Sequence, residues 1–123
     1  MRVIEEPLAG GVTCVEVEGR LDAATVPVLE KALQHLLADA QYHLIVDMKA
    51  ISYISSSGLR ALLTARRQAR SWGGDVYLCQ LSTRVREILE MVGFLSVFGV
   101  YATREEARGA FPQSASATNS FRS

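Results

Sequence analysis

At residues 47–60 the chain reads DMKAISYISSSGLR. An apolar strand is predicted to end at Met48, and a short polar turn then leads to three consecutive serines. Gly58 and Leu59 open an amphipathic run that extends to Trp72, so the serines stand at the N-terminus of a predicted helix. Backbone N–H groups there lack intrahelical partners, and the positive end of the helix dipole tolerates a phosphate. The turn therefore predicts a switch that works by adding negative charge.

The residues on either side of this turn alternate between strand and helix patterns. Strands are predicted near 2–6, 12–18, 44–46, 76–79 and 97–100, and helices near 25–37, 58–72, 83–92 and from 103 onward. The run at 44–46 is apolar and β-branched, which predicts a strand covered on both faces. An initial hairpin followed by alternating strands and helices predicts an α/β fold with a mixed, mostly parallel sheet and the order ββαβαβαβα.

Polar residues at the helix starts indicate where each helix begins. Asp22 or Thr25 is expected to cap the first helix and Ser82 the third. The third helix is expected to bury its apolar positions, including Val92, and to end at Gly93. The second helix carries four arginines (Arg60, Arg66, Arg67 and Arg70) with no acidic residue among them. This basic stretch is either a solvated face or a surface that docks an acidic protein partner.

Composition restricts the class of protein. The chain has 123 residues, of which 49% are apolar and 21% charged, and its 13 basic and 13 acidic residues cancel. This balance predicts neither a nucleic-acid partner nor an anionic-membrane partner. We expect one domain over residues 1–111 and a disordered tail over 112–123, where the sequence turns to Ser, Ala, Thr and Asn without periodicity. With no leader pattern, a cytoplasmic protein is expected.

The residues that could carry redox, metal or hydrolytic chemistry lack the necessary spacing. Cys14 and Cys79 lie in apolar strand-like runs, which predicts buried free thiols. The two histidines and two cysteines show no metal-ligand spacing, and no glycine-rich phosphate loop occurs, so no metal or cofactor is predicted. A serine hydrolase is a weak alternative, because Ile54 occupies the first glycine position of a nucleophile elbow centred on Ser56. Simple helix capping needs only one of the three serines.

Four segments of the chain together resemble the STAS domain, and more narrowly the bacterial anti-sigma factor antagonists. They are GRLD at 19–22, LIVD at 44–47, SSGL at 56–59 and the stretch from Gly73-Gly74 to Ser82. The resemblance extends over about residues 3–110 without large gaps. It implies a sheet flanked by helices on one side and a protein that is not an enzyme.

The same resemblance implies a mechanism. Members of that family are substrates of a dedicated serine kinase that is also an anti-sigma factor. The unphosphorylated antagonist binds the kinase and frees its target, phosphorylation breaks the complex, and a PP2C-type phosphatase resets it. The phosphorylated serine of the family directly precedes the glycine, which implies Ser57 here. The protein is expected to be a monomer or a weak homodimer.

The partner-binding surface is expected around this turn. Asp22 matches the aspartate of the Gly-x-Leu-Asp element, and Ser56 flanks the implied phosphosite. The full expected set is Asp22, Ser55, Ser56, Ser57, Gly58, Arg60 and Arg67. Family members commonly carry an aspartate where this chain has Ser55, a change that still permits capping but removes a carboxylate. That departure leaves open a structural STAS subunit of a signalling or transporter complex.

Overall fold

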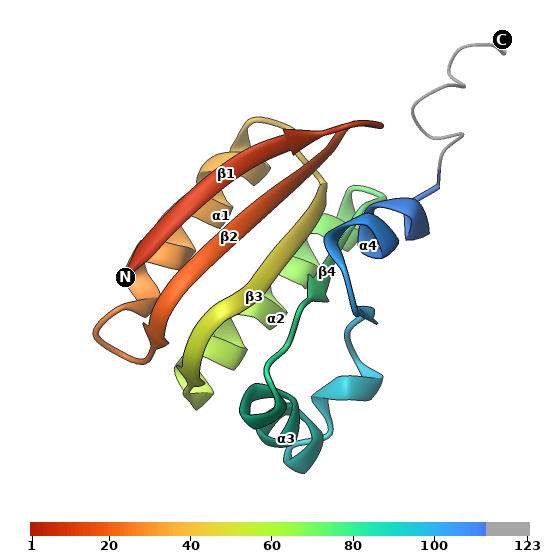
Figure 1. Cartoon of the computed structure of the whole chain (residues 1–123). Helices are drawn as coiled ribbons and strands as arrows, with labels where there is room; N and C mark the ends of the chain where they lie inside the picture. Colours follow the sequence, from red (N-terminus) through yellow and green to blue (C-terminus); the bar gives the residue numbers. More distant parts are fainter. Residues whose placement is uncertain (113–123) are drawn as a thin grey trace, which may run out of the picture.

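The computed structural model describes residues 1–112 and contains one five-stranded sheet, with the strands side by side in sequence order (Figure 1). The strands are β1 (Arg2–Leu8), β2 (Val12–Leu21), β3 (His43–Ile54), β4 (Asp75–Cys79) and β5 (Val100–Tyr101). β1 pairs with β2 in antiparallel orientation, and the other three pairings are parallel. The predicted mixed, mostly parallel sheet is confirmed. Most of the predicted tail, residues 113–123, lies outside the described residues.

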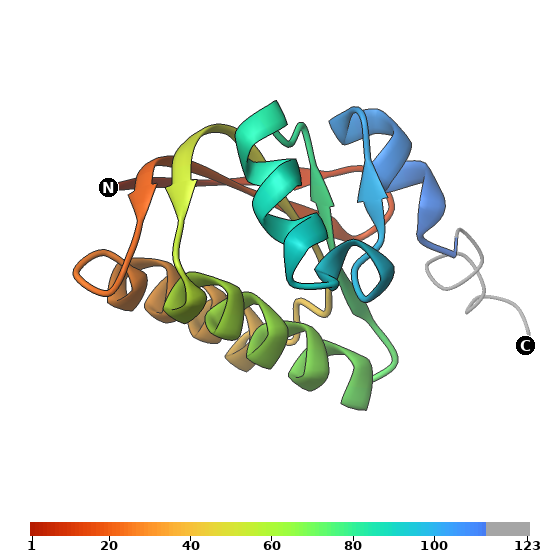
Figure 2. The same cartoon turned by 90° about the horizontal axis from the view of Figure 1, so that it is seen from below.

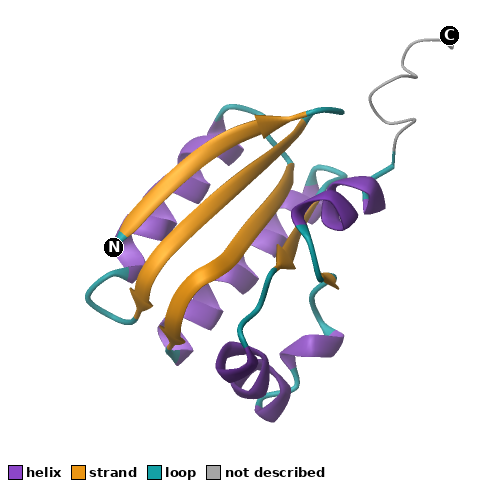
Figure 3. Cartoon of the chain, viewed as in Figure 1, coloured by secondary structure: helices purple, strands orange, loops and turns teal. Residues whose placement is uncertain are grey.

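Three α-helices and a short 3₁₀-helix connect the strands, and a fourth α-helix follows the last strand (Figure 3). They are α1 (Val26–Ala38), α2 (Ser56–Ser71), α3 (Thr83–Met91), the 3₁₀-helix η1 (Phe94–Ser96) and α4 (Arg104–Ala110). The order ββαβαβαβα is therefore confirmed. α1 and α2 lie side by side against one face of the sheet (Figure 2), where the Gln34 amide nitrogen donates to the Gln68 carbonyl oxygen at 2.6 Å. Within the described chain, no helix combines the length and the apolar character needed to cross a membrane.

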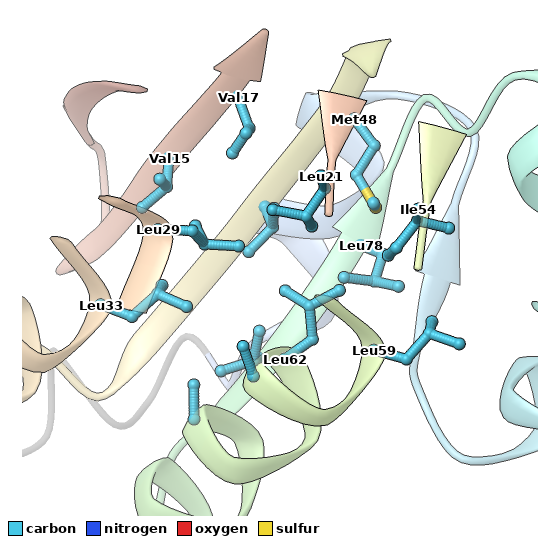
Figure 4. Close-up of a cluster of buried hydrophobic side chains, with 14 of the residues drawn as sticks. Val15, Val17, Leu21, Leu29, Leu33, Met48, Ile54, Leu59, Leu62 and Leu78 are labelled. Atoms are coloured by element: carbon cyan, nitrogen blue, oxygen red, sulfur yellow. The ribbon is translucent and has the colours of Figure 1, made fainter. Parts of the chain in front are cut away.

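The main core lies between the sheet and the two long helices. Apolar side chains of β2, β3 and β4 point toward α1 and α2, and all of the labelled side chains in Figure 4 are at least 95% buried. They are Val15, Val17, Leu21, Leu29, Leu33, Met48, Ile54, Leu59, Leu62 and Leu78. Burying one such side chain contributes about 1.5–3 kcal/mol, whereas an exposed ion pair contributes about 0–1 kcal/mol. Apolar packing therefore positions the ends of β2 and β3 relative to α2.

α4 covers part of the opposite face of the sheet, so the expectation of helices on one side only is incomplete. Cys14, Ile45 and Cys79 point to that face and pack with Ala107 and Phe111. Because the central strands are apolar at successive positions, both of their faces need cover, as predicted for 44–46. Both cysteines are buried free thiols, and burial raises the pKa of each to about 12.

β3 is much longer than predicted, because residues 50–54 form a strand and not a polar turn. They pair in parallel with the end of β2, in a register that places Arg20 opposite Tyr53 and Leu21 opposite Ile54. Two register shifts in this pairing interrupt the simple alternation of polar and apolar residues. The strand therefore leads directly into the serine turn.

The region after α3 also differs from the prediction. α3 ends at Met91, and Gly93 adopts a φ of +77°, which turns the chain back toward α2. Val92 is therefore 50% exposed rather than buried. The strand predicted at 97–100 is reduced to Val100–Tyr101, because η1 and its C-cap occupy residues 94–97.

Candidate functional site

Two loops meet where the parallel strands β2 and β3 end. The backbone N–H of Ser55 donates to the carbonyl oxygen of Leu21 at 2.8 Å. This bond holds the loop that starts at Asp22 next to the serine turn. The carboxyl ends of adjacent parallel strands are where α/β proteins commonly place binding residues. The structure thus brings together the two sequence segments expected to form the site.

The serine turn divides its three hydroxyl groups between different roles. Ser55 is the N-cap of α2, and its Oγ accepts a hydrogen bond from the backbone N–H of Gly58 at 3.3 Å. The predicted capping by Ser55 is confirmed. Ser56 is exposed, whereas Ser57 is half-buried and its Oγ lies 2.9 Å from the Oγ of Ser55. Because Ser55 alone supplies the cap, capping does not explain Ser56 or Ser57.

Gly58 allows the first turn of α2 to approach both strand ends closely. A Cβ atom added to Gly58 would lie 2.8 Å from Cγ of Leu21 and 3.1 Å from Cγ1 of Ile54. Carbon atoms prefer separations of about 3.5–4.0 Å, so a side chain here would force the turn and the strands apart. Gly58 is buried, and its place in the expected site is to set the position of the serines.

We predict that Gly58→Ala lowers the free energy of unfolding by about 1–3 kcal/mol, because the added methyl group overpacks this contact. Urea denaturation monitored by circular dichroism would measure the change. Gly109→Ala is the matched control, since a Cβ atom at Gly109 meets no atom within 4 Å. Equal stability of the two variants would contradict the proposed role of Gly58.

Asp22 organises the neighbouring loop. Its Oδ1 accepts hydrogen bonds from the backbone N–H groups of Ala24 at 3.1 Å and Thr25 at 3.2 Å. Burial alone would raise the pKa of the Asp22 carboxyl, but these bonds, the Thr25 hydroxyl and Arg20 together hold that pKa below its ordinary value. A fixed negative charge thus stands beside the serine turn. Thr25 occupies the N-cap position of α1 without a side-chain capping bond.

Arg20 and Tyr53 also belong to this surface, although the sequence analysis did not identify them. The Arg20 guanidinium lies 4.5 Å from the centroid of the Tyr53 ring, and its Nε lies 3.6 Å from Oδ2 of Asp22. The Arg20 side chain is 62% exposed, so a cation is available next to the turn. Recognising residues 50–54 as a strand paired with β2 would have placed Tyr53 opposite Arg20.

The arginines of α2 separate into two pairs. Arg66 and Arg70 form ion pairs with Asp75 at 3.4 Å and 3.0 Å. Arg60 and Arg67 are exposed and form no ion pair within residues 1–112. Among the arginines of α2, only this second pair remains available to an acidic partner.

An apolar groove lies between α2 and the segment that follows α3. We call it the α2–α3 groove; its volume is about 280 Å³, and it is lined by Ser56, Leu59, Arg60, Leu63, Val92 and Phe94. Ser56 therefore connects the serine turn to the groove.

The described residues contain no group of three or more His, Cys, Asp or Glu side chains that could hold a metal ion. They also contain no hydrogen bond between a histidine and a serine of the turn, where Ser55 lies against Ser57 and caps α2.

Comparison with known proteins gives consistent results. Residues 4–107 match the family model described as STAS domain. The name of BtrV of Bordetella bronchiseptica suggests the role of an anti-sigma factor antagonist. BtrV is 37% identical to this chain over 95 residues, which cover 77% of this chain and 82% of BtrV. The crystal structure of an anti-sigma factor antagonist from Mycobacterium paratuberculosis has a TM-score of 0.80 and 27% identity, covering 89% of this chain and 92% of that one.

SpoIIAA of Bacillus provides a more distant comparison, which supports the fold alone. Its unphosphorylated form has a TM-score of 0.69 with 19% identity, over 88% of this chain and 96% of that one. Its phosphorylated form has a TM-score of 0.68 with 20% identity, over 88% and 97% of the two chains.

Proposed function

The chain belongs to the STAS domain family, and we propose that it is a non-catalytic anti-sigma factor antagonist controlled by phosphorylation of Ser57. The unmodified protein binds an anti-sigma factor that is also its serine kinase, and this binding releases the target of that kinase. Phosphorylation abolishes binding, and a PP2C-type phosphatase restores it. The observation that carries the proposal is that the hydroxyl of Ser57 is not needed for the cap of α2 and lies in the turn that the family resemblance singles out.

The names of the relatives support the antagonist role. BtrV and the Mycobacterium paratuberculosis protein are both named for this role, and both cover more than three quarters of the present chain. Determination of SpoIIAA in an unphosphorylated and a phosphorylated form indicates that a protein of this fold accepts a phosphate.

The physical chemistry of the turn supports a charge switch. A neutral hydroxyl can be desolvated against a partner at modest cost if it finds a hydrogen bond there. A phosphate on Ser57 carries about −1.5 to −2 charges, so its desolvation against the same partner is far more costly. The N-terminus of α2 stabilises that charge within the folded protein. Phosphorylation should therefore leave the fold intact and act on association.

The binding surface that we propose contains the seven expected residues, and Gly58 contributes by positioning the turn. Asp22 adds a fixed negative charge in the neighbouring loop. Ser55 replaces the aspartate common in the family, which removes one further negative charge from this turn. The protein acts in the cytoplasm as a monomer or weak homodimer, with residues 1–111 as the binding unit.

The test is to incubate the protein with candidate anti-sigma factor serine kinases and ATP, and to map the modified residue by mass spectrometry. We expect one phosphate per chain, on Ser57. Ser57→Ala, which keeps both neighbouring serines, is the control and should remain unmodified. Modification of Ser55 or Ser56 in the control, or of no serine in the parent protein, would contradict the proposal.

A further inference from the structure

We propose that the α2–α3 groove is the second half of the docking surface and receives an apolar side chain of the partner kinase, with an acidic residue of the kinase beside it. This inference rests on the proposed function. The serine turn alone specifies neither the groove nor the apolar and acidic side chains of the kinase that would bind there.

The apolar character of the groove and its rim indicates an interface. Four of its six lining residues are apolar, and Val92 on its wall is 50% exposed. Met91 precedes Val92 and is 85% exposed. Large contiguous apolar patches are uncommon on monomeric proteins and often mark sites where another molecule binds.

The groove is built on rigid elements, so it exists before a partner arrives. Leu59 is buried in the main core, and Phe94 lies against Phe98 with 6.1 Å between the ring centroids. Phe98 is itself part of the main core. The α3–η1 segment faces α2 in Figure 2, which gives the groove two anchored walls. A preformed pocket reduces the ordering cost of binding.

Charge at the rim determines the chemistry of the occupant. Arg60 lines the groove, and Arg67 lies about two turns further along α2 on the same side. Neither forms an ion pair within residues 1–112, whereas Arg66 and Arg70 are both paired with Asp75. An apolar side chain in the groove would thus place an adjacent Asp or Glu of the kinase next to an unpaired guanidinium. That arrangement gives electrostatic complementarity at the rim.

The groove also offers a route by which the phosphate acts. Residues three apart in a helix are neighbours, so a phosphate on Ser57 lies within reach of Arg60. An arginine that binds this phosphate is no longer available to the acidic residue of the kinase. Phosphorylation would then weaken the complex at both halves of the surface.

A second apolar groove provides the control. It lies between β1 and α1, has a volume of about 510 Å³, and is lined by Val3, Glu5, Pro27, Val28, Lys31, Ala32 and His35. None of its lining residues belongs to the serine turn, and nothing indicates what would cover it. Val28 in this groove is 46% exposed, which matches the exposure of Val92.

The experiment compares Val92→Glu with Val28→Glu. Isothermal titration calorimetry would measure the Kd for whichever serine kinase phosphorylates Ser57. We expect Val92→Glu to raise this Kd by roughly ten-fold or more, because a charge enters an apolar contact, and Val28→Glu to change it by less than about two-fold. Arg60→Glu should also raise the Kd roughly ten-fold or more. Melting temperatures of all variants would verify folding.

The outcomes separate this inference from the function on which it rests. If the kinase phosphorylates Ser57 but binds the Val92→Glu and Val28→Glu variants equally well, the groove proposal is wrong and the antagonist function stands. If Arg60→Glu leaves the Kd unchanged while Val92→Glu raises it, the acidic residue in the proposed occupant is wrong. If no anti-sigma factor kinase modifies Ser57 or binds the protein, both proposals are overturned.

Discussion

Ser57→Asp should weaken binding to the serine kinase by roughly a hundred-fold or more, whereas Ser57→Ala should bind constitutively. The aspartate places a charge where the unmodified protein offers a hydroxyl, half-buried in the first turn of α2. A charge desolvated in an interface without a partner cation costs several kcal/mol. Alanine removes only one hydroxyl whose hydrogen bond is to Ser55, so it leaves the cap from Ser55 to Gly58 in place.

Surface plasmon resonance with the kinase immobilised would measure these affinities. Ser71→Asp is the control for net charge, because Ser71 is the last residue of α2 and lies at the opposite end from the serine turn. We expect its affinity to remain within about two-fold of the parent protein, since an exposed charge so far from the contact is screened. If the protein phosphorylated on Ser57 bound the kinase as tightly as the unmodified form, the switch mechanism would be wrong.

Local patterns predicted most of the fold because they depend on neighbouring residues. Apolar spacing indicated α1 and α2, and polar caps such as Ser82 marked helix starts, since both signals arise within a few positions. Residues 50–54 carried no comparable signal. They form a strand because they pair with the end of β2, which lies about 30 residues earlier in the chain. Missing that pairing concealed the contact between Arg20 and Tyr53.

In the candidate site, too, the features formed by neighbouring residues could be predicted, and those formed by residues distant in sequence could not. The serine turn and its cap are contiguous in sequence, so they could be predicted. The groove beside them depends on the end of α3 at Met91 and the return of the chain at Gly93, which expose Val92. Periodicity extended the helix by one residue and assigned Val92 to the core. One residue at a helix end therefore decides whether a side chain packs inside or lines a surface.

Arg104 on α4 and Asp47 on β3 form a buried ion pair that sequence patterns could not reveal, since the two residues are 57 positions apart. Nη2 of Arg104 lies 2.7 Å from Oδ2 of Asp47, whose side chain is only 2% exposed. The hydrogen bond to Asp47 raises the pKa of Arg104, although partial burial opposes this. The amide of Gln80 also donates to Oδ2 of Asp47 at 2.8 Å. Arg104 is therefore the only cation that balances a buried carboxylate within the described structure.

We predict that Arg104→Ala lowers the free energy of unfolding by about 3–5 kcal/mol, because it leaves the Asp47 charge buried without a cation. Urea denaturation would measure the loss. Arg108→Ala on the same helix is the control; Arg108 pairs at 3.1 Å with Glu105, whose side chain is 76% exposed, so its loss should cost at most about 1 kcal/mol.

A second substitution separates the loss of a cation from the loss of arginine packing. Asp47→Asn combined with Arg104→Ala should be more stable than Arg104→Ala alone, because the amide carries no charge and its oxygen can still accept a hydrogen bond from Gln80 or from the backbone N–H of Lys49. If the double variant were no more stable than the single one, the uncompensated charge could not be the cause of the loss. The destabilisation would then come from the other contacts of Arg104, which are its ion pairs with Glu6 and Glu16 and the packing of its stem between α4 and the sheet.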